Sequence, residues 1–506
     1  PVSTTDAIVS NAGLGTVNLV GVEVLNVIAG NRNVTVRGTA ENDDLTYQPT
    51  GARAGTVTKA GLNLVANLSD VSGLRIDGGD DGNDTLTVLG TAAADAFTVS
   101  PTVITHNTLR GVSTISNIDA LYVRGEAGAD TFFVTPGAIP IHLLGGEPTG
   151  GPAGDALTVS VTSSVTFQPG LQGGAGRFDA AGSQPVYYEQ IEQLTVDGDG
   201  YVGVTIPGTA GSDVFILTAT SPQDDFSVSV NGVTMTCTDF ASATLEGLDG
   251  DDVFTVTPMA GFTTDVAIHG GDPTAGGDTL YVNGTAAGET IVVDLAAATV
   301  RMDTAKPIAF TGVESLSVNA AGGVDTMRVT GSATYQYTPG ETQDAGLLTT
   351  ATLPILFTNL GPGETLRLTG TSLVARGTAA NNAFVLGTYL TVDGRVNIVR
   401  TGLAAMTLDG LAGDDTFTVT PGGLPIFIDG GDPTGRGDVL TLLPGEAPTF
   451  TPGSKSDEGS FSFATLPPVT FDHIAATLVD LGVGAGGAAT IQGTSGNDGI
   501  TARGTA

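Results

Sequence analysis

"LDGLAGDDTFTVTPGGLPIFIDGGDPTGRGDVLTL", residues 408–442, consists of short segments of alternating apolar and polar residues separated by turns rich in Gly, Asp and Pro. In the segment 415–421, Phe417 and Val419 fall on one face of an extended chain, and the threonines fall on the other. Alternation with a period of two, in segments rich in Val, Thr and Phe, predicts β-strands with one buried face. Gly and Pro interrupt the chain too often for a helical period to persist, so we expect an all-β protein.

Three phrases recur along the chain. The long phrase at 408–442 has two further copies, at 123–159 and 245–282. A second phrase consists of Gly-Thr-Ala, two more residues, and then Asp, Glu or Asn. It begins at residues 38, 90, 208, 284 and 377, and a Gly-Thr-Ser variant begins at 493. An aromatic residue followed closely by Pro-Gly forms the third phrase, at 166–170, 337–340 and 449–453. Self-similarity of this kind predicts a tandem-repeat architecture.

The Gly-Thr-Ala phrases divide the chain into modules. We expect the end of an incomplete repeat at 1–37, a short module at 38–89, a long module at 90–207, a long module with an inserted short one at 208–376, a long module at 377–492, and the start of an incomplete repeat at 493–506. A repeat that is incomplete at both ends predicts a contact between subunits that completes it.

Two architectures fit these modules. The rhythm of strand, Gly/Asp turn and strand favours a parallel β-solenoid, like a β-roll or β-helix, in which each coil stacks on the next. Asn-Gly in "FSVSVNGVTMTC", residues 226–237, and Asp-Gly in "LTVDGRVNIV", residues 390–399, are typical of tight antiparallel hairpins. We therefore expect a solenoid with hairpin insertions, and the alternative is a string of β-sandwich domains.

The net charge of the chain limits the classes of partner that it is expected to bind. Among 506 residues, 18 are Lys or Arg and 53 are Asp or Glu, which gives a formal net charge of −35. So negative a chain is not expected to bind nucleic acid, and cations are its natural counterparts. No apolar run approaches the roughly 20 residues of a membrane-spanning helix. Cys237 is the only cysteine, so neither an intrachain disulfide nor a cysteine metal cluster can form.

The segment "GDDGNDTL", residues 79–86, resembles the Gly/Asp nonapeptide of bacterial RTX calcium-binding proteins. In that family, Asp carboxylates and backbone carbonyls hold calcium between adjacent coils, and oxygen ligands suit this ion. The resemblance implies calcium at the Gly/Asp turns, with candidate ligands Asp80, Asp81, Asp84, Asp249, Asp251, Asp252, Asp272, Asp278, Asp414, Asp415, Asp432 and Asp438. The alternative is that these carboxylates cap their own turns by accepting backbone N–H groups.

In its repeats the chain is similar to large bacterial β-strand-repeat extracellular proteins, including RTX-like adhesins and matrix or surface-layer proteins. This resemblance implies a secreted structural protein that assembles with itself, head to tail, into a filament, sheath or surface layer stiffened by calcium. A monomeric calcium-dependent adhesin stalk is the alternative. Sequons at Asn33, Asn67 and Asn283 are candidate glycan sites on an extracellular or cell-surface protein.

An enzyme is not expected. The chain has four histidines, none at an equivalent position of the repeats, and it lacks the nucleophile-elbow, zinc-protease and phosphate-loop motifs. A polysaccharide-active β-helix enzyme is less favoured because aromatic residues are few, Trp is absent, and the carboxylate pairs recur in every module. An active site is usually a single constellation.

Overall fold

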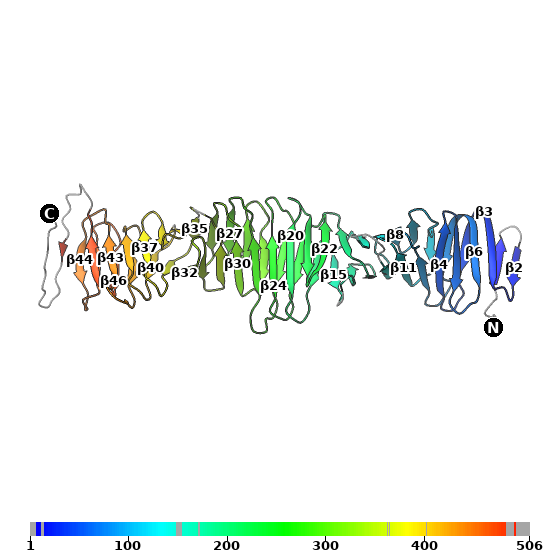
Figure 1. Cartoon of the computed structure of the whole chain (residues 1–506), viewed down its shortest axis with the longest axis horizontal. Coiled ribbons are helices and arrows are strands. Elements are labelled where there is room, and N and C mark those ends of the chain that lie inside the picture. The colour runs from blue at the N-terminus through cyan, green and yellow to red at the C-terminus, as the bar shows by residue number, and fades with distance from the viewer. Residues whose placement is uncertain are drawn as a thin grey trace. The chain divides into compact units, whose positions relative to one another are not determined.

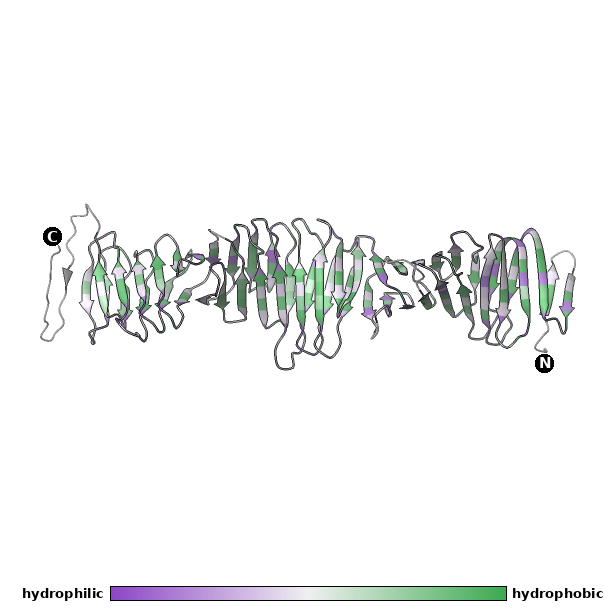
Figure 2. Cartoon of the chain, viewed as in Figure 1, coloured by the Kyte–Doolittle hydropathy of each residue, from purple (hydrophilic) through white to green (hydrophobic). Residues whose placement is uncertain are grey.

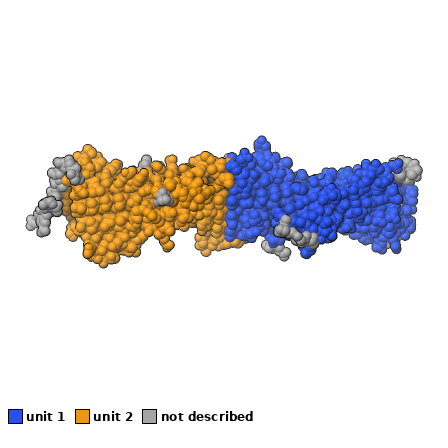
Figure 3. Space-filling model, turned by 45° about the horizontal axis from the view of Figure 1, so that its top comes forward, with its two compact units in different colours: residues 1–209, 213–246, 263–265 blue, residues 210–212, 247–262, 266–506 orange. Residues whose placement is uncertain are grey.

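In the computed structural model, the described residues are 7–11, 15–147, 154–170, 173–361, 363, 365–400, 402–481 and 490–491. Within these ranges the regular structure consists of β-strands, so the prediction of an all-β chain is confirmed (Figure 1). No helix of the described residues is long and apolar enough to cross a membrane. The chain forms two compact units (Figure 3): unit 1 comprises 1–209, 213–246 and 263–265, and unit 2 comprises 210–212, 247–262 and 266–506. The finer module boundaries stay a prediction.

Unit 1 contains two main sheets and the small pair β1 (Ala7–Asn11) and β2 (Gly15–Leu19). Its first sheet holds β3 (Val24–Arg37), β4 (Asp44–Gly51), β5 (Ala54–Lys59), β6 (Val65–Asp77), β7 (Thr85–Leu89), β10 (Thr114–Ser116), β11 (Ala120–Ala127), β13 (Ile141–Glu147), β15 (Val165–Pro169), β16 (Gly176–Ala180), β17 (Val186–Glu189), β19 (Gly203–Pro207) and β23 (Ser242–Glu246). Its second sheet holds β8 (Ala96–Ser100), β9 (Val103–His106), β12 (Thr131–Val134), β14 (Ala156–Ser160), β18 (Gln193–Asp197), β20 (Val214–Ala219), β21 (Phe226–Val230) and β22 (Val233–Thr238).

Unit 2 also has two sheets. The first holds β25 (Asp265–His269), β27 (Thr290–Asp294), β28 (Thr299–Met302), β29 (Ile308–Thr311), β31 (Thr326–Thr330), β35 (Thr365–Leu368), β37 (Ala383–Leu386), β38 (Leu390–Val392), β39 (Asn397–Val399), β41 (Thr416–Val419), β43 (Val439–Leu442) and β47 (Ala476–Val479). The second holds β24 (Val253–Thr257), β26 (Thr279–Asn283), β30 (Ser315–Asn319), β32 (Thr334–Pro339), β33 (Gly346–Thr349), β34 (Pro354–Thr358), β36 (Ser372–Arg376), β40 (Ala405–Asp409), β42 (Ile426–Asp429), β44 (Thr449–Pro452), β45 (Gly459–Ser462), β46 (Val469–Asp472) and β48 (Thr490–Ile491).

Most strands pair in parallel with the equivalent strand of the next coil. In unit 1, β12 lies between β8 and β14, and Phe132 is opposite Phe97 and Leu157. The inward side chains of these strands are almost fully buried, and the alternation of buried and more exposed residues matches the predicted period of two. Figure 2 shows the same alternation as apolar bands along the strands. Equivalent apolar residues therefore stack coil upon coil into a continuous core, an arrangement consistent with a β-solenoid.

Three-stranded antiparallel meanders interrupt the parallel stack. In one of them, β15 pairs with β16 and β16 with β17 in antiparallel fashion, while β17 pairs in parallel with β13 and β15 with β19. The order in the sheet is therefore β13, β17, β16, β15 and β19, so the first strand of the meander lies farthest from β13 and the third strand returns to pair with it. The same order recurs in β4–β6, β20–β22, β27–β29, β32–β34, β37–β39 and β44–β46.

The two predicted hairpins are confirmed as parts of such meanders. Asn231-Gly232 joins β21 to β22, and Asp393-Gly394 joins β38 to β39, with positive φ at all four residues as a type I′ turn requires. The mostly parallel pairing departs from the alternative of antiparallel sandwich domains, because each hairpin is flanked by parallel partners.

The aromatic-Pro-Gly phrase forms the end of the first strand of a meander and the start of the turn that follows this strand. In β32 to β34, a Cβ on Gly346 would lie 2.5 Å from the Phe357 ring and 2.7 Å from the Tyr337 ring. Only glycine in the middle strand leaves room for two aromatic rings to cover it, so this residue must stay small while its neighbours stay large.

Candidate functional site

The Gly-Thr-Ala phrase forms a corner between the two sheets, which the acid of the same phrase closes. At 90–95, the Thr91 N–H donates to Asp95 Oδ2 at 2.6 Å, and the Thr91 hydroxyl donates to it at 3.1 Å. A Cβ on Gly90 would lie 2.8 Å from that oxygen. The same bond from the Thr N–H is made to Asp43, Asp213, Glu289 and Asn382 in the other copies. The phrase therefore encodes a turn capped by its own acid or amide.

Corner acids also link neighbouring coils. In unit 1, the Asp95 N–H donates to Asp130 Oδ1 at 2.7 Å, the Asp130 N–H to Asp155 Oδ1 at 2.7 Å, and the Asp155 N–H to Glu192 Oε2 at 2.6 Å. We call such a row an acid column. Other columns are Asp43–Asp84–Asp119 in unit 1 and Asp252–Asp278–Glu314, Glu289–Asp325 and Asn382–Asp415–Asp438 in unit 2. Each bond satisfies a backbone N–H group that has no acceptor in the strand ladders.

Most column members are buried, which disfavours their charged form. Asp130, Asp325 and Asp415 have no solvent-exposed surface, and removal from water raises the pKa of each to about 6. Neighbouring carboxylates of the column raise these pKa values further. Within the described structure, Oδ2 of Asp130 and of Asp415 has no hydrogen-bond partner. A Cβ on Gly125 would overlap Asp130 Oδ2 and one on Gly410 would overlap Asp415 Oδ2, so both oxygens lie against glycines of the corners.

The loop GGDPTAGGD, residues 270–278, encloses a carboxylate from the preceding coil. Asp251 Oδ1 accepts the N–H groups of Thr274 and Ala275 at 3.0 Å and of Gly277 at 3.2 Å, and its Oδ2 accepts that of Gly276 at 2.9 Å. These bonds lower the pKa of Asp251 to about 2, because they favour the charged form. The loop is thus a backbone nest for an anion that the chain itself supplies.

The third copy of the long phrase repeats this nest. Asp414 accepts the N–H groups of Gly435 at 2.7 Å, Arg436 at 3.0 Å and Gly437 at 3.2 Å, and its pKa is lowered for the same reason. The first copy has Ala129 at this position, and its loop at 148–153 lies outside the described residues.

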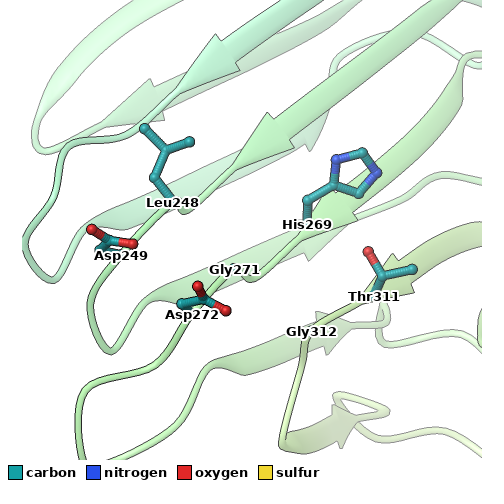
Figure 4. Close-up of a pocket in the computed structure, with 7 residues that line it drawn as sticks. All are labelled: Leu248, Asp249, His269, Gly271, Asp272, Thr311 and Gly312. Carbon is teal, nitrogen blue, oxygen red and sulfur yellow. The ribbon is translucent and has the colours of Figure 1, made fainter.

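A shallow hollow of about 450 Å³ lies at the same corner of unit 2 (Figure 4). Asp249 and Asp272 line it from neighbouring coils, where the Asp272 N–H donates to the Leu248 carbonyl at 2.8 Å and the Gly250 N–H donates to the Asp272 carbonyl at 3.2 Å. Both side chains are exposed, and Figure 4 shows their carboxylates on adjacent turns, with His269 farther along the hollow. The structure thus brings two predicted ligands from neighbouring coils to one open corner.

The twelve predicted calcium ligands fall into three groups. Exposed side chains are Asp80, Asp81, Asp249, Asp272 and Asp432; buried members of the columns are Asp84, Asp252, Asp278, Asp415 and Asp438; and the nests hold Asp251 and Asp414. Asp80 pairs with Arg37. The hydrogen bonds described for these nest and column carboxylates come from N–H groups of neighbouring coils, whereas the alternative prediction placed them within each acid's own turn. Coordination of calcium by any of the twelve stays a prediction.

Two further groups of metal-ligand type were not anticipated from the sequence. Asp457, Asp472 and His473 offer ligand atoms within 4.8 Å of one another, as do Asp224, Asp225 and Asp239. Each group combines the loop between the first two strands of a meander with the end of its third strand: Asp472 ends β46 and His473 follows it, and Asp239 follows β22. His473 and Asp239 both have positive φ. That left-handed conformation is a property of the folded corner, and the sequence signals it only through a preference for Asp, Asn or His.

His473 is hydrogen-bonded to a further acid, Asp429, which is not one of the three residues of its group. Its Nδ1 lies 2.8 Å from Asp429 Oδ1, and that hydrogen bond is the main reason why the pKa of His473 is raised. Asp429 is the last residue of β42 and lies opposite Asp472 of β46, and β46 in turn pairs with β45 of the same meander, so the stacking of the meander on β42 brings Asp429 to His473.

The chain matches no known protein-family model, and comparison with curated proteins finds no significant match.

Proposed function

We propose that the chain is a secreted structural protein whose stacked coils form a mechanical element of an extracellular filament, sheath or surface layer. The observation that supports this most directly is the double connection between successive coils. Parallel strand ladders join them along both sheets, and the acid columns join them again at the corners. A coil that moved relative to its neighbour would break both sets of bonds.

The use of the acidic residues also supports a structural function. The column carboxylates accept backbone N–H groups in corner after corner, and the nest carboxylates hold loops of the next coil. We propose that these carboxylates serve the fold instead of a reaction. Catalytic carboxylates need access to a substrate, whereas Asp130, Asp278 and Asp415 are fully buried.

Assembly with further copies of the chain is part of the proposal. A parallel ladder in which each strand pairs with its equivalent can be continued by another strand of the same kind, since an exposed strand edge presents unpaired N–H and C=O groups. A heterologous, head-to-tail contact of this type produces an open filament.

Calcium is the proposed counterion of the exposed carboxylates, above all of Asp249 and Asp272 in their shared hollow. The net charge of −35 supports cation binding in general. Oxygen ligands from carboxylates and carbonyls on adjacent turns are of the type that calcium prefers.

Negative-stain electron microscopy of the purified chain, over a concentration series with and without a calcium chelator, tests the proposal. Filaments that lengthen with concentration support assembly, and shortening on chelation supports the role of calcium. Particles of one size at all concentrations contradict assembly and favour the monomeric adhesin stalk. Filaments indifferent to the chelator leave the structural proposal standing and remove calcium from it.

A further inference from the structure

Four of the five Gly-Thr-Ala corners share one feature besides the cap. In these four, the second polar atom of the capping residue meets a complementary group from the turn or strand end that returns to the corner. These pairs are Asp43 with Lys59, Asp95 with His106, Asp213 with Asn231, and Asn382 with Asp393. When the capping residue is an amide, as at Asn382, its partner is an acid, so the pairing is complementary in either direction.

The fifth corner departs from this pattern. Glu289 Oε1 accepts the Thr285 N–H at 2.8 Å, as expected, but Oε2 is buried and has no hydrogen-bond partner among the described residues. The residue that returns to this corner is Asp303, whose Oδ1 accepts the Thr290 N–H at 2.8 Å. The capping residue and the residue that returns to this corner are therefore both acids. In the other four corners, one member of this pair can donate a hydrogen bond to the other.

The next coil adds a second buried carboxyl to Glu289. Asp325 Oδ1 accepts the Glu289 N–H at 2.7 Å, and the carboxyl groups of Asp325 and Glu289 lie within hydrogen-bonding reach of each other. Asp325 is fully buried and Glu289 is 6% exposed. Oδ2 of Asp325, like Oε2 of Glu289, has no other partner within the described structure.

Two carboxylates in contact inside a protein repel each other, and a single proton between them converts the repulsion into a strong hydrogen bond. The charged groups that face Asp325 are Glu289 and Asp303, both acidic. Burial is the main cause that raises the pKa of Asp325 to about 6, and these two acids raise it further.

We propose that Asp325 keeps a proton that faces Glu289 in mildly acidic solution and releases it as the solution approaches neutrality. The corner of 284–289 in unit 2 is thus a pH-sensitive joint between two coils. Below the pKa of an unfolded acid, about 4, folded and unfolded chains are both protonated and the contribution to stability is complete. Between about 4 and 6 only the folded chain keeps the proton, so the stabilisation falls as the pH rises.

Three substitutions in the full chain test the joint. Glu289→Gln keeps an oxygen for the Thr285 N–H and supplies an Nε2 that donates to Asp325, and Asp325→Asn supplies the donor from the other side. In either variant, an amide N–H group replaces the proton as the hydrogen-bond donor between the two side chains. Asn382→Asp does the reverse, because it places a carboxylate beside Asp393. Glu341→Gln, at an exposed acid of the same unit, is the matched control.

The first readout is stability in urea between pH 3.5 and 8. One proton changes the folding equilibrium constant up to tenfold per pH unit between pH 4 and 6. We expect Glu289→Gln and Asp325→Asn to reduce the wild-type pH dependence by that amount, Asn382→Asp to increase it, and Glu341→Gln to leave it unchanged. Profiles of the first two variants parallel to the wild type would overturn the proposal.

The second readout is independent of unfolding. Infrared spectra of the folded wild type should show the C=O stretch of a protonated carboxyl at pH 5 that disappears by pH 8, and part of this band should be missing in either variant. Identical bands in wild type and both variants would exclude the proposed proton, even if one variant is too unstable for the urea series.

Discussion

The N–H of Gly276 donates to Asp251 Oδ2 at 2.9 Å, so a glycine of the GGDPTAGGD loop binds a carboxylate of the preceding coil. A Cβ on Gly276 would lie 2.9 Å from the same oxygen, which explains why the loop requires glycine there. Two features that looked like separate ion-binding turns in the sequence are therefore the two halves of one internal contact. The carboxylate of Asp251 thus orders the loop of the next coil, because it accepts the N–H groups of Thr274, Ala275 and Gly277 as well.

Replacing Asp251 with Ala should release the loop at 274–277. We expect the amides of Thr274 to Gly277 to exchange with solvent at least tenfold faster, since each loses its acceptor. The equivalent loop at 435–437, held by Asp414, is an internal control and should keep its protection. Hydrogen exchange followed by mass spectrometry measures both loops in one sample. Equal exchange of the 274–277 amides in wild type and variant would contradict the nest.

The lowered pKa of Asp251 gives the same contact a definite pH range. Its pKa in the folded chain is about 2, below the value of an unfolded Asp, so the stabilisation is present above pH 4 and disappears as the pH falls through about 2. We expect loop protection to persist at pH 4 and to fall near pH 2. A loop that already opens at pH 4 would show that the carboxylate does not hold it.

Asp130 should respond to pH in the opposite sense. Its pKa is raised to about 6, so its contribution to stability is complete below pH 4 and is lost as the pH rises through 6. Asp130→Asn keeps the oxygen that accepts the Asp95 N–H and carries no charge, just as the Asn382 amide oxygen accepts the Thr378 N–H in its own corner. We expect this variant to be about 1 kcal/mol more stable than the wild type at pH 8 and equal to it at pH 4. Urea unfolding at the two pH values measures the difference, and an equal gain at both would refute the electrostatic explanation.

Local pattern was enough to predict the strands. In β41, Phe417 and Val419 are fully buried and the threonines face outward, as the alternation in 415–421 requires. The hairpin at Asn231-Gly232 was equally predictable, because a type I′ turn depends on two adjacent residues. Information of this kind is contained in a few consecutive positions.

The strand order of the meanders and the hydrogen-bond partners of the acids could not be predicted from consecutive residues. Asp130 accepts the N–H of Asp95 and donates to Asp155, and none of these three is near another in the sequence. A Gly/Asp turn that binds an ion and one that accepts backbone N–H groups have the same composition. Only the stacking of coils distinguishes them, since it decides which donors face each carboxylate.

Gly270 lies where the backbones of two coils approach each other closely. A Cβ there would lie 2.5 Å from Asp278 Oδ2 and would also overlap the Gly312 carbonyl of the next coil, and neither can move away, because both belong to the packed corner. We expect Gly270→Ala to destabilise the chain by about 3 kcal/mol. At Gly423 a Cβ would meet nothing within 4 Å, so Gly423→Ala is the control and should be close to neutral. Similar denaturation midpoints for the two variants would contradict the close approach.

The carboxylates of Asp249 and Asp272 allow the calcium prediction to be tested apart from the fold. Both are exposed, so Asp249→Asn and Asp272→Asn should leave the strands and the acid columns intact. If the pair binds calcium, the double variant should lose the heat of calcium binding that the wild type gives in calorimetry, together with any rise in denaturation temperature on calcium addition. Asp80→Asn with Asp81→Asn, at the other exposed pair of predicted ligands, shows whether binding belongs to that turn instead. Calcium binding that survives in both double variants would exclude these two turns as its site. An absence of binding in the wild type would show that the carboxylates serve only contacts within the fold.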